Sequence, residues 1–171
     1  YGTLKLYIPF RALLNENGRV SNPVLAEVVA TNEKYPEIEK GDVIILGHNT
    51  INNKAFELFT KDGIRTLSVP VDRWILGKIG AKGEFLPLFG NTVAQRVPEK
   101  PLSSIIITPD AYKKTEENKM NIIAVAPGVS DIKPGQTAIV HRHSDYEAVY
   151  HVNGEEHRTV VVYERDIVAI A

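Results

Sequence analysis

The feature that most constrains this sequence is a repeat within it. The block Ala26–Leu46 aligns without a gap with the block Met120–Val140, at an offset of 94 positions (120 − 26). Each block contains a β-rich run, a polar turn, a glycine corner and a second β-rich run. A repeated supersecondary unit predicts two copies of one architecture along the chain. A chance likeness between β-rich segments is the weaker explanation, because the match also runs through the turn.

The matching residues lie in the strands and at the corner of each block. The pairs are Val28 with Ile122, Val29 with Ile123, Ala30 with Ala124, Ile38 with Ile132 and Gly41 with Gly135. Two later stretches also correspond, namely Ile64–Leu67 with His157–Val160 and Val71–Leu76 with Arg165–Ile170. The repeat therefore extends over most of both copies.

Short β-rich runs bounded by turn residues recur along the chain, and no stretch keeps a helical period for a substantial length. The sequence predicts strands at Leu4–Leu14, Leu25–Thr31, Gly41–Leu46, Lys54–Thr60, Arg65–Val69, Val71–Ile79, Asn91–Val97, Asn121–Ala126, Thr137–Arg142, Tyr146–Val152, Arg158–Tyr163 and Asp166–Ala171. Asp62-Gly63 and Asn153-Gly154 are hairpin turn pairs.

This pattern predicts an all-β fold of two small β-barrels or sandwiches. The first unit is expected over residues 1–80 and the second over residues 81–171, with Gly80–Glu84 as the linker. Units of only ~85 residues have little core of their own, so docking or oligomerisation would add burial.

One stretch of the second copy has no counterpart in the first. Ile105, Ile106 and Ile107 stand between proline-marked turns and are followed by a polar run. A β-branched triplet is normally buried in a strand, whereas the flanking prolines are typical of a loop. The triplet is therefore either a short strand or an apolar hook for a partner. The first copy has no equivalent triplet, which favours the hook.

Length supports the same interpretation. The second copy has 30 positions from Asn91 to Asn121, whereas the first has 23 from Leu4 to Glu27. The longer connection is the one that carries the isoleucine triplet, so the extra residues are expected to serve binding.

Composition excludes several classes of protein. The net charge of −1 gives no global attraction to nucleic acid or to an anionic membrane. No apolar run reaches the ~20 residues of a membrane span. There are no cysteines, which excludes disulfides, thiolate metal sites and a cysteine nucleophile and fits a cytoplasmic protein.

Two polar groups were weighed as sites. His141, His143, His151 and His157 could bind a metal, but polar side chains on the outside of a barrel explain them better, since no acidic ligand pattern accompanies them. Asp145, Glu147, Glu155 and Glu156 are expected in solvated turns rather than as a catalytic pair. With no nucleotide or nucleophile motif either, the sequence predicts no metal, no cofactor and no enzyme activity.

Three large aromatic residues, Phe56, Phe59 and Trp74, are expected to pack in the core or between the two units. A platform for a carbohydrate or a peptide is the alternative.

The second copy resembles the chaperonin-10 (GroES-like co-chaperonin) family over nearly all of Phe85–Ala171. The motifs that carry the resemblance are PLFGNTV at Pro87–Val93, SSIIITPD at Ser103–Asp110, IIAVAPG at Ile122–Gly128, KPGQ at Lys133–Gln136 and ERDIVAI at Glu164–Ile170. The first copy is a weaker relative that keeps the Gly41–Ile45 strand and lacks the loop tripeptide.

The resemblance implies two tandem GroES-like β-barrels, the first of them diverged. It implies a non-enzymatic co-chaperonin that forms an oligomeric ring, caps a GroEL-like chaperonin ring and assists protein folding. The family's mobile loop corresponds to residues 98–119, and the implied contact residues are Ser104, Ile105, Ile106, Ile107 and Thr108. The alternative is a virus-encoded capping or decoration protein that kept the fold and lost the chaperonin.

Overall fold

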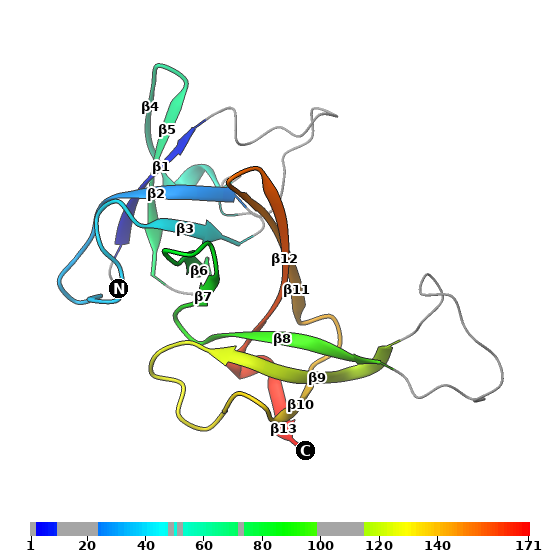
Figure 1. Cartoon of the computed structure of the whole chain (residues 1–171). Coiled ribbons are helices and arrows are strands. Elements are labelled where there is room, and N and C mark those ends of the chain that lie inside the picture. The colour runs from blue at the N-terminus through cyan, green and yellow to red at the C-terminus, as the bar shows by residue number, and fades with distance from the viewer. Residues whose placement is uncertain (1–2, 10–23, 48–49, 51–52, 72–73, 99–114) are drawn as a thin grey trace.

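The computed structural model describes residues 3–9, 24–47, 50, 53–71, 74–98 and 115–171 (Figure 1). Regular structure in these residues is β-strand, apart from two single-turn 3-10 helices at Lys54–Phe56 (η2) and Glu164–Asp166 (η4). The all-β prediction is confirmed for this part of the chain. Among the same residues, no helix has the length and apolar character needed to cross a membrane.

The first sheet contains seven strands in the order β4-β5-β1-β2-β3-β6-β7, and every pairing is antiparallel. Their bounds are Thr3–Pro9 (β1), Val24–Ala30 (β2), Val43–Leu46 (β3), Glu57–Lys61 (β4), Ile64–Pro70 (β5), Ile75–Ile79 (β6) and Phe85–Pro87 (β7).

The second sheet contains six strands in the order β11-β12-β8-β9-β10-β13, also antiparallel. Their bounds are Asn91–Pro98 (β8), Thr115–Val125 (β9), Thr137–Val140 (β10), Asp145–Val152 (β11), Glu155–Tyr163 (β12) and Ile167–Ile170 (β13). No pairing among the described strands closes either sheet into a barrel.

The sequence repeat appears as a repeated strand order. Strands β1 to β6 take the same places in the first sheet as β8 to β13 take in the second. Even the irregularities coincide: the ladder skips Leu76 between two pairs of β3 and β6, and it skips Val168 between the matching pairs of β10 and β13. From β5 to β6 and from β12 to β13 the two sheets therefore share pairing register as well as order, whereas the outer strand β4 has an extra residue that β11 lacks.

The pairing register corrects one part of the sequence match. Ile75 pairs with Leu46 and Ile167 pairs with Val140, so the last strands correspond at an offset of 92 (167 − 75) rather than 94. The reason is that the segments leading to the last strand are shorter in the second half. Leu76 and Val168 are thus equivalent positions.

Strand β7 is an addition to the first sheet. A tight turn over Gly80–Glu84, closed by a 2.8 Å hydrogen bond from Gly80 N to Glu84 O, brings Phe85–Pro87 back against β6. These residues follow the expected linker but pair with the first sheet. The division of the chain at residue 80 remains a prediction.

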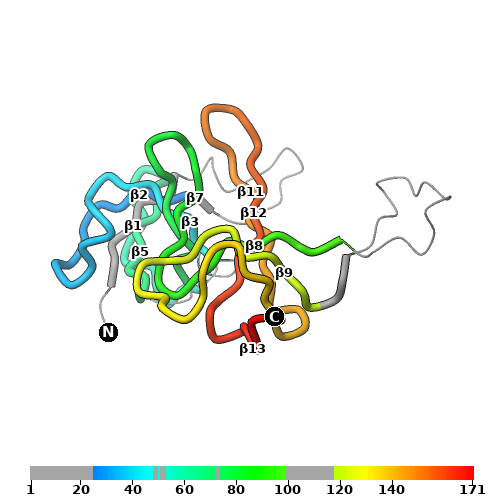
Figure 2. The backbone as a smooth tube through the Cα atoms, turned by 60° about the horizontal axis from the view of Figure 1, so that its bottom comes forward, coloured from blue at the N-terminus to red at the C-terminus, as the bar shows by residue number. Residues whose placement is uncertain are grey.

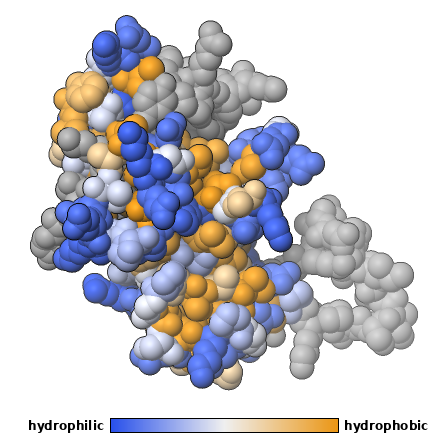
Figure 3. All heavy atoms as spheres, turned by 60° about the vertical axis from the view of Figure 1, so that its left-hand side comes forward, coloured by the Kyte–Doolittle hydropathy of each residue, from blue (hydrophilic) through white to orange (hydrophobic). Residues whose placement is uncertain are grey.

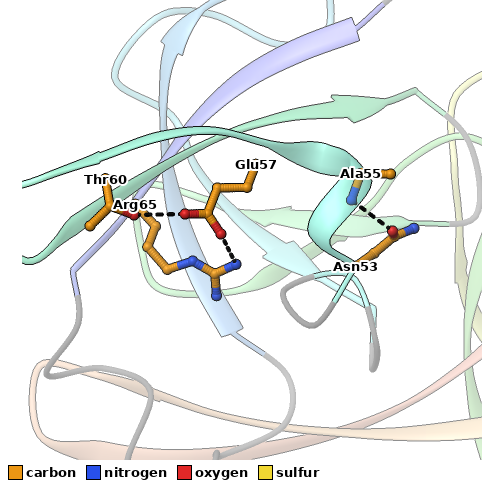
Figure 4. Close-up of polar contacts among 5 residues, drawn as sticks. All are labelled: Asn53, Ala55, Glu57, Thr60 and Arg65. Carbon is orange, nitrogen blue, oxygen red and sulfur yellow. Dashed lines mark hydrogen bonds and ion pairs between the residues drawn. The ribbon is translucent and has the colours of Figure 1, made fainter.

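Several strand boundaries differ from those predicted, most of all the start of β9, which lies at Thr115 rather than Asn121. The segment Lys54–Thr60 begins with helix η2, which Asn53 caps by accepting a 3.1 Å hydrogen bond from Ala55 N (Figure 4). Strand β6 begins only at Ile75. Strand β10 ends at Val140 because a turn follows, in which Ser144 N and Oγ both donate to His141 O.

Both predicted hairpin turns are confirmed. Asp62 and Gly63 join β4 to β5 with φ values of 52° and 74°, and Asn153 and Gly154 join β11 to β12 with φ values of 53° and 85°. Positive φ at both central residues is typical of the type I′ turn, whose twist matches that of the strands.

Three apolar clusters form the core. The first lies in the first sheet and the second in the second sheet. The third joins the sheets, because Ile45 and Leu76 of the first pack with Ala148, Tyr150 and Val161 of the β11–β12 hairpin. Figure 1 shows this hairpin rising from the second sheet to lie beside the first. The sheets thus share buried apolar surface.

Candidate partner-binding loop

The predicted binding loop connects β8 to β9. The last pair of this ladder is Pro98 with Thr115, so residues 99–114 connect the ends of two hydrogen-bonded strands. The predicted loop 98–119 is too long at both ends, since Pro98 belongs to β8 and residues 115–119 belong to β9. The predicted contact residues Ser104, Ile105, Ile106, Ile107 and Thr108 lie outside the described residues. The structure therefore places the base of the loop.

Equivalent residues give a direct comparison of the two connections. Leu6 pairs with Val28 in the first sheet, and Ala94 pairs with Ile122 at the matching place in the second. The intervals are 22 positions (28 − 6) and 28 positions (122 − 94). The second connection is longer by six residues, close to the seven estimated from the sequence.

At the base of the loop, β8 has a paired neighbour on one side only among the described strands, namely β9. Strand β12 pairs with β8 between Asn91 and Ala94, and within the described residues β8 beyond Ala94 pairs only with β9. Arg96 lies in this outer part and forms an ion pair with Asp145 at the start of β11, with 3.0 Å between Nε and Oδ2. This contact ties the outer part of the β8–β9 ribbon to β11, which lies beyond β12 in the sheet.

The inner end of the ribbon is held by buried polar side chains. Thr92 Oγ1 donates to Val162 O at 2.9 Å. Asn91 Nδ2 donates to Ile75 O at 3.0 Å and to Leu88 O at 2.7 Å. Buried donors and acceptors are costly to leave unpaired, so these bonds fix where β8 starts relative to the first sheet.

The histidines are distributed over two places. His141 and His143 lie in the exposed turn after β10, beyond the end of that strand. His157 stacks on Tyr150 at 5.4 Å, and His151 Nε2 lies 3.8 Å from Glu156 Oε2. Within the described residues, no three His, Cys, Asp or Glu side chains are grouped in a way that could hold a metal ion.

The acidic residues weighed as a catalytic pair have ordinary contacts. Asp145 pairs with Arg96. Glu156 accepts a 2.8 Å hydrogen bond from Arg158 Nε, and this bond lowers the pKa of the Glu156 carboxyl. Glu147 and Glu155 are exposed. All four lie on strands β11 and β12, so the expectation that they lie in turns is wrong.

The three aromatic residues divide into two groups. Phe56 and Trp74 meet edge to face at 5.3 Å and pack against the first cluster, as predicted. Phe59 is exposed on β4, so the prediction that it packs in the core or between units is wrong. All five residues of β4 are exposed, so no described element covers this strand. The pairing between Glu57 and Phe59 is irregular and leaves Leu58 as an extra residue.

The second sheet ends in an apolar surface that sequence reasoning missed. Ile139 of β10 and Val168 of β13 are exposed. Ile170 is exposed as well, but it pairs with the buried Ala138 and so lies on the opposite face from Ile139. A cleft of about 370 Å³ lies between β13 and the Gly128–Ile132 turn. Figure 3 shows apolar side chains gathered low on the molecule, at the height of the second sheet. No sequence signal pointed to this surface, because both the strand pattern and the repeat predict such residues to be buried.

No protein-family model matches the chain, and neither does any curated protein sequence. The resemblance to co-chaperonins therefore stays a prediction.

Proposed function

We propose that this chain is a non-enzymatic co-chaperonin. Two tandem GroES-like units would place the β8–β9 loop of each chain against the rim of a GroEL-like chaperonin ring. Ile105, Ile106 and Ile107 would enter an apolar groove of the chaperonin, with Ser104 and Thr108 flanking them.

One observation carries the proposal. The two sheets share strand order and register, yet the second has a β8–β9 connection six residues longer, and that connection holds the isoleucine triplet. The shared architecture does not require the extra residues. An apolar insertion that the fold does not require is best explained by a partner.

The energetics suit a reversible contact. Burying one isoleucine side chain contributes about 1.5–3 kcal/mol, and ordering a loop opposes binding by about 1–2 kcal/mol per residue fixed. A single loop would therefore bind weakly. Several loops presented together would bind more tightly through effective concentration, while each contact could still release.

The test is a chaperonin assay with a matched pair of variants. The wild-type chain is expected to slow the ATPase of a purified GroEL-like chaperonin and to support refolding of a denatured client. Ile106→Asp should lose both effects, since it places a charge in an apolar groove. Ile123→Asp is the control, because Ile123 is 53% exposed on β9 and lies outside the loop.

Absence of any wild-type effect on the ATPase would sink the proposal, as would an Ile106→Asp variant as active as the wild type. Either result would favour the alternative of a structural or assembly protein. The exposed apolar surface of β10 and β13 suits that alternative as well.

A further inference from the structure

Equivalent positions of the two sheets differ sharply in exposure. Ile45 and Leu76 of the first sheet are 0% and 6% exposed, whereas Ile139 and Val168, which occupy the same positions in the second, are 36% and 59% exposed. Because strand order and register are the same, the difference comes from what covers each sheet.

The cover on the first sheet is the hairpin of the second half. Ala148, Tyr150 and Val161 of β11 and β12 pack directly on Ile45 and Leu76. Inside one chain, therefore, the later unit lays its hairpin on the earlier unit.

The first half carries a shorter hairpin at the matching place in its sheet, with four paired positions against eight. Its edge strand β4 exposes Leu58 and Phe59. Lys61 and Ser68 take the places of Tyr150 and Val161. All five residues of β4 are exposed. Phe59 pairs with Thr66 where Ala148 pairs with Thr159, so Phe59 occupies the position of a residue that is buried between the sheets. Phe59 itself is 56% exposed.

The β4–β5 hairpin is held in shape by Glu57. Its carboxylate accepts 2.8 Å hydrogen bonds from Thr60 Oγ1 and from the Arg65 guanidinium (Figure 4). The hydrogen bond from Thr60, followed by that from Arg65, lowers the pKa of Glu57. The hairpin is thus a formed element that needs no rearrangement to dock.

The hairpin and the open surface lie at opposite ends of the molecule. The β4–β5 hairpin is at the top of Figure 1 and β13 is at the bottom, and Figure 2 also separates β5 from β13. They cannot meet within one chain. We propose that the β4–β5 hairpin of one copy packs on the Ile139–Val168 surface of a second copy, repeating between chains the contact that joins the two halves within one.

The proposed contact is made by the hairpin and not by strand addition along β13. A Cβ on Gly77 would lie 2.4 Å from Leu86 O of β7. The equivalent of Gly77 in β13 is Ala169. A strand that paired with β13 as β7 pairs with β6 would therefore clash with the Cβ of Ala169. The face of the sheet is open, but the edge does not accept a copy of β7 in the same register.

This inference rests on the proposed function in one respect: a chaperonin cap needs several chains assembled together, so that several loops bind at once. The contact itself is argued from the two halves of the chain. It is heterologous, since each copy gives a hairpin at one end and accepts one at the other, and such contacts generate closed rings or open filaments.

Sedimentation velocity of the full chain over a range of concentrations tests the contact without any chaperonin. The wild type should form assemblies larger than a dimer. Val168→Asp removes the acceptor and Phe59→Asp removes the donor. Each should weaken self-association by about a hundredfold or more, because a charge would be buried in an apolar contact. Both substitutions are at exposed positions, and circular dichroism verifies the fold.

Mixing the two variants gives the decisive result. Val168→Asp keeps an intact hairpin and Phe59→Asp keeps an intact acceptor, so the mixture should form a one-to-one dimer and stop there. Ile139→Asp is a second acceptor variant with the same expectation. Ile123→Asp is the matched control and should assemble like the wild type, because its equivalent Val29 takes no part in the cluster between the sheets.

A wild type that stays monomeric would overturn the inference, as would folded variants that fail to dimerise when mixed. Failure of the proposed function has a different signature. In that case the wild type and Ile106→Asp would both assemble, and neither would affect the chaperonin ATPase.

Discussion

Tyr146 lies on β11 and packs against the cluster that joins the two sheets. Burial raises the pKa of its hydroxyl to about 12. Burial also raises the pKa of Tyr150, in the same cluster. Both side chains are acids whose neutral form the folded protein favours, so the region between the sheets is sensitive to high pH.

The raised pKa of Tyr146 predicts a loss of stability in alkali. The unfolded chain releases this proton near pH 10, and the folded chain holds it until about pH 12. The contribution to the free energy of unfolding is therefore full below pH 10 and falls as the pH rises through 12. Urea denaturation at several pH values should show a decline that Tyr146→Phe makes shallower. An unchanged slope in Tyr146→Phe would contradict the assignment, and any slope that remains is expected from Tyr150.

Some residue-level features were predictable from the sequence. The two hairpin turns follow from local backbone preferences, so Asp62-Gly63 and Asn153-Gly154 could be assigned directly. Exposure of Phe59 and Val168 could not be predicted, because it depends on which sheet and which hairpin are covered by another part of the fold. These are tertiary facts that no local pattern encodes.

At the scale of the element, β6 and β7 are in unusually close contact. A Cβ on Gly77 would lie 2.4 Å from Leu86 O and 2.7 Å from the Phe85 ring. Glycine is required here by close packing of two strands rather than by backbone conformation. The strand pair depends on this one position.

Gly77→Ala is expected to separate β7 from β6. The substitution should lower the free energy of unfolding by about 1–3 kcal/mol, the usual range for overpacking, measured by urea denaturation. Ala169→Gly, at the equivalent exposed position of β13, is the control and should cost about 1 kcal/mol at most. A Gly77→Ala protein as stable as the wild type would show that β7 is not held in this register.

The placement of β7 was beyond sequence reasoning. The repeat assigns Phe85–Pro87 to the second copy, since it follows the glycine-containing linker. Three residues ending in proline carry too little pattern to name a pairing partner. The close fit of Gly77, which only the fold reveals, decides the sheet to which β7 belongs.

At the scale of the whole molecule, one cluster holds the two sheets together. Leu76 contributes to it from the first sheet and Tyr150 from the second. The strand order within each sheet was implicit in the repeat and the turn signals. Contact between the sheets was expected only in general terms, because small units benefit from docking.

Leu76→Ala is expected to weaken both sheets. Loss of a buried leucine side chain typically lowers the free energy of unfolding by about 2–5 kcal/mol. Hydrogen exchange should therefore become faster in β3 and β6 and also in the β11–β12 hairpin. Val168→Ala removes an exposed side chain at the equivalent position and should change stability by less than about 0.5 kcal/mol. Faster exchange confined to the first sheet would mean that the sheets unfold independently.

The hairpin contact inside each chain has a consequence for stoichiometry. In an assembly built by the proposed contact, junctions between the two halves of one chain would alternate with junctions between chains. A closed ring would therefore always contain an even number of half-chain units. Only the second unit of each pair carries the long loop. Binding loops would then occur at every second unit of the ring. A cap of this kind would contact its partner through half as many loops as it has units.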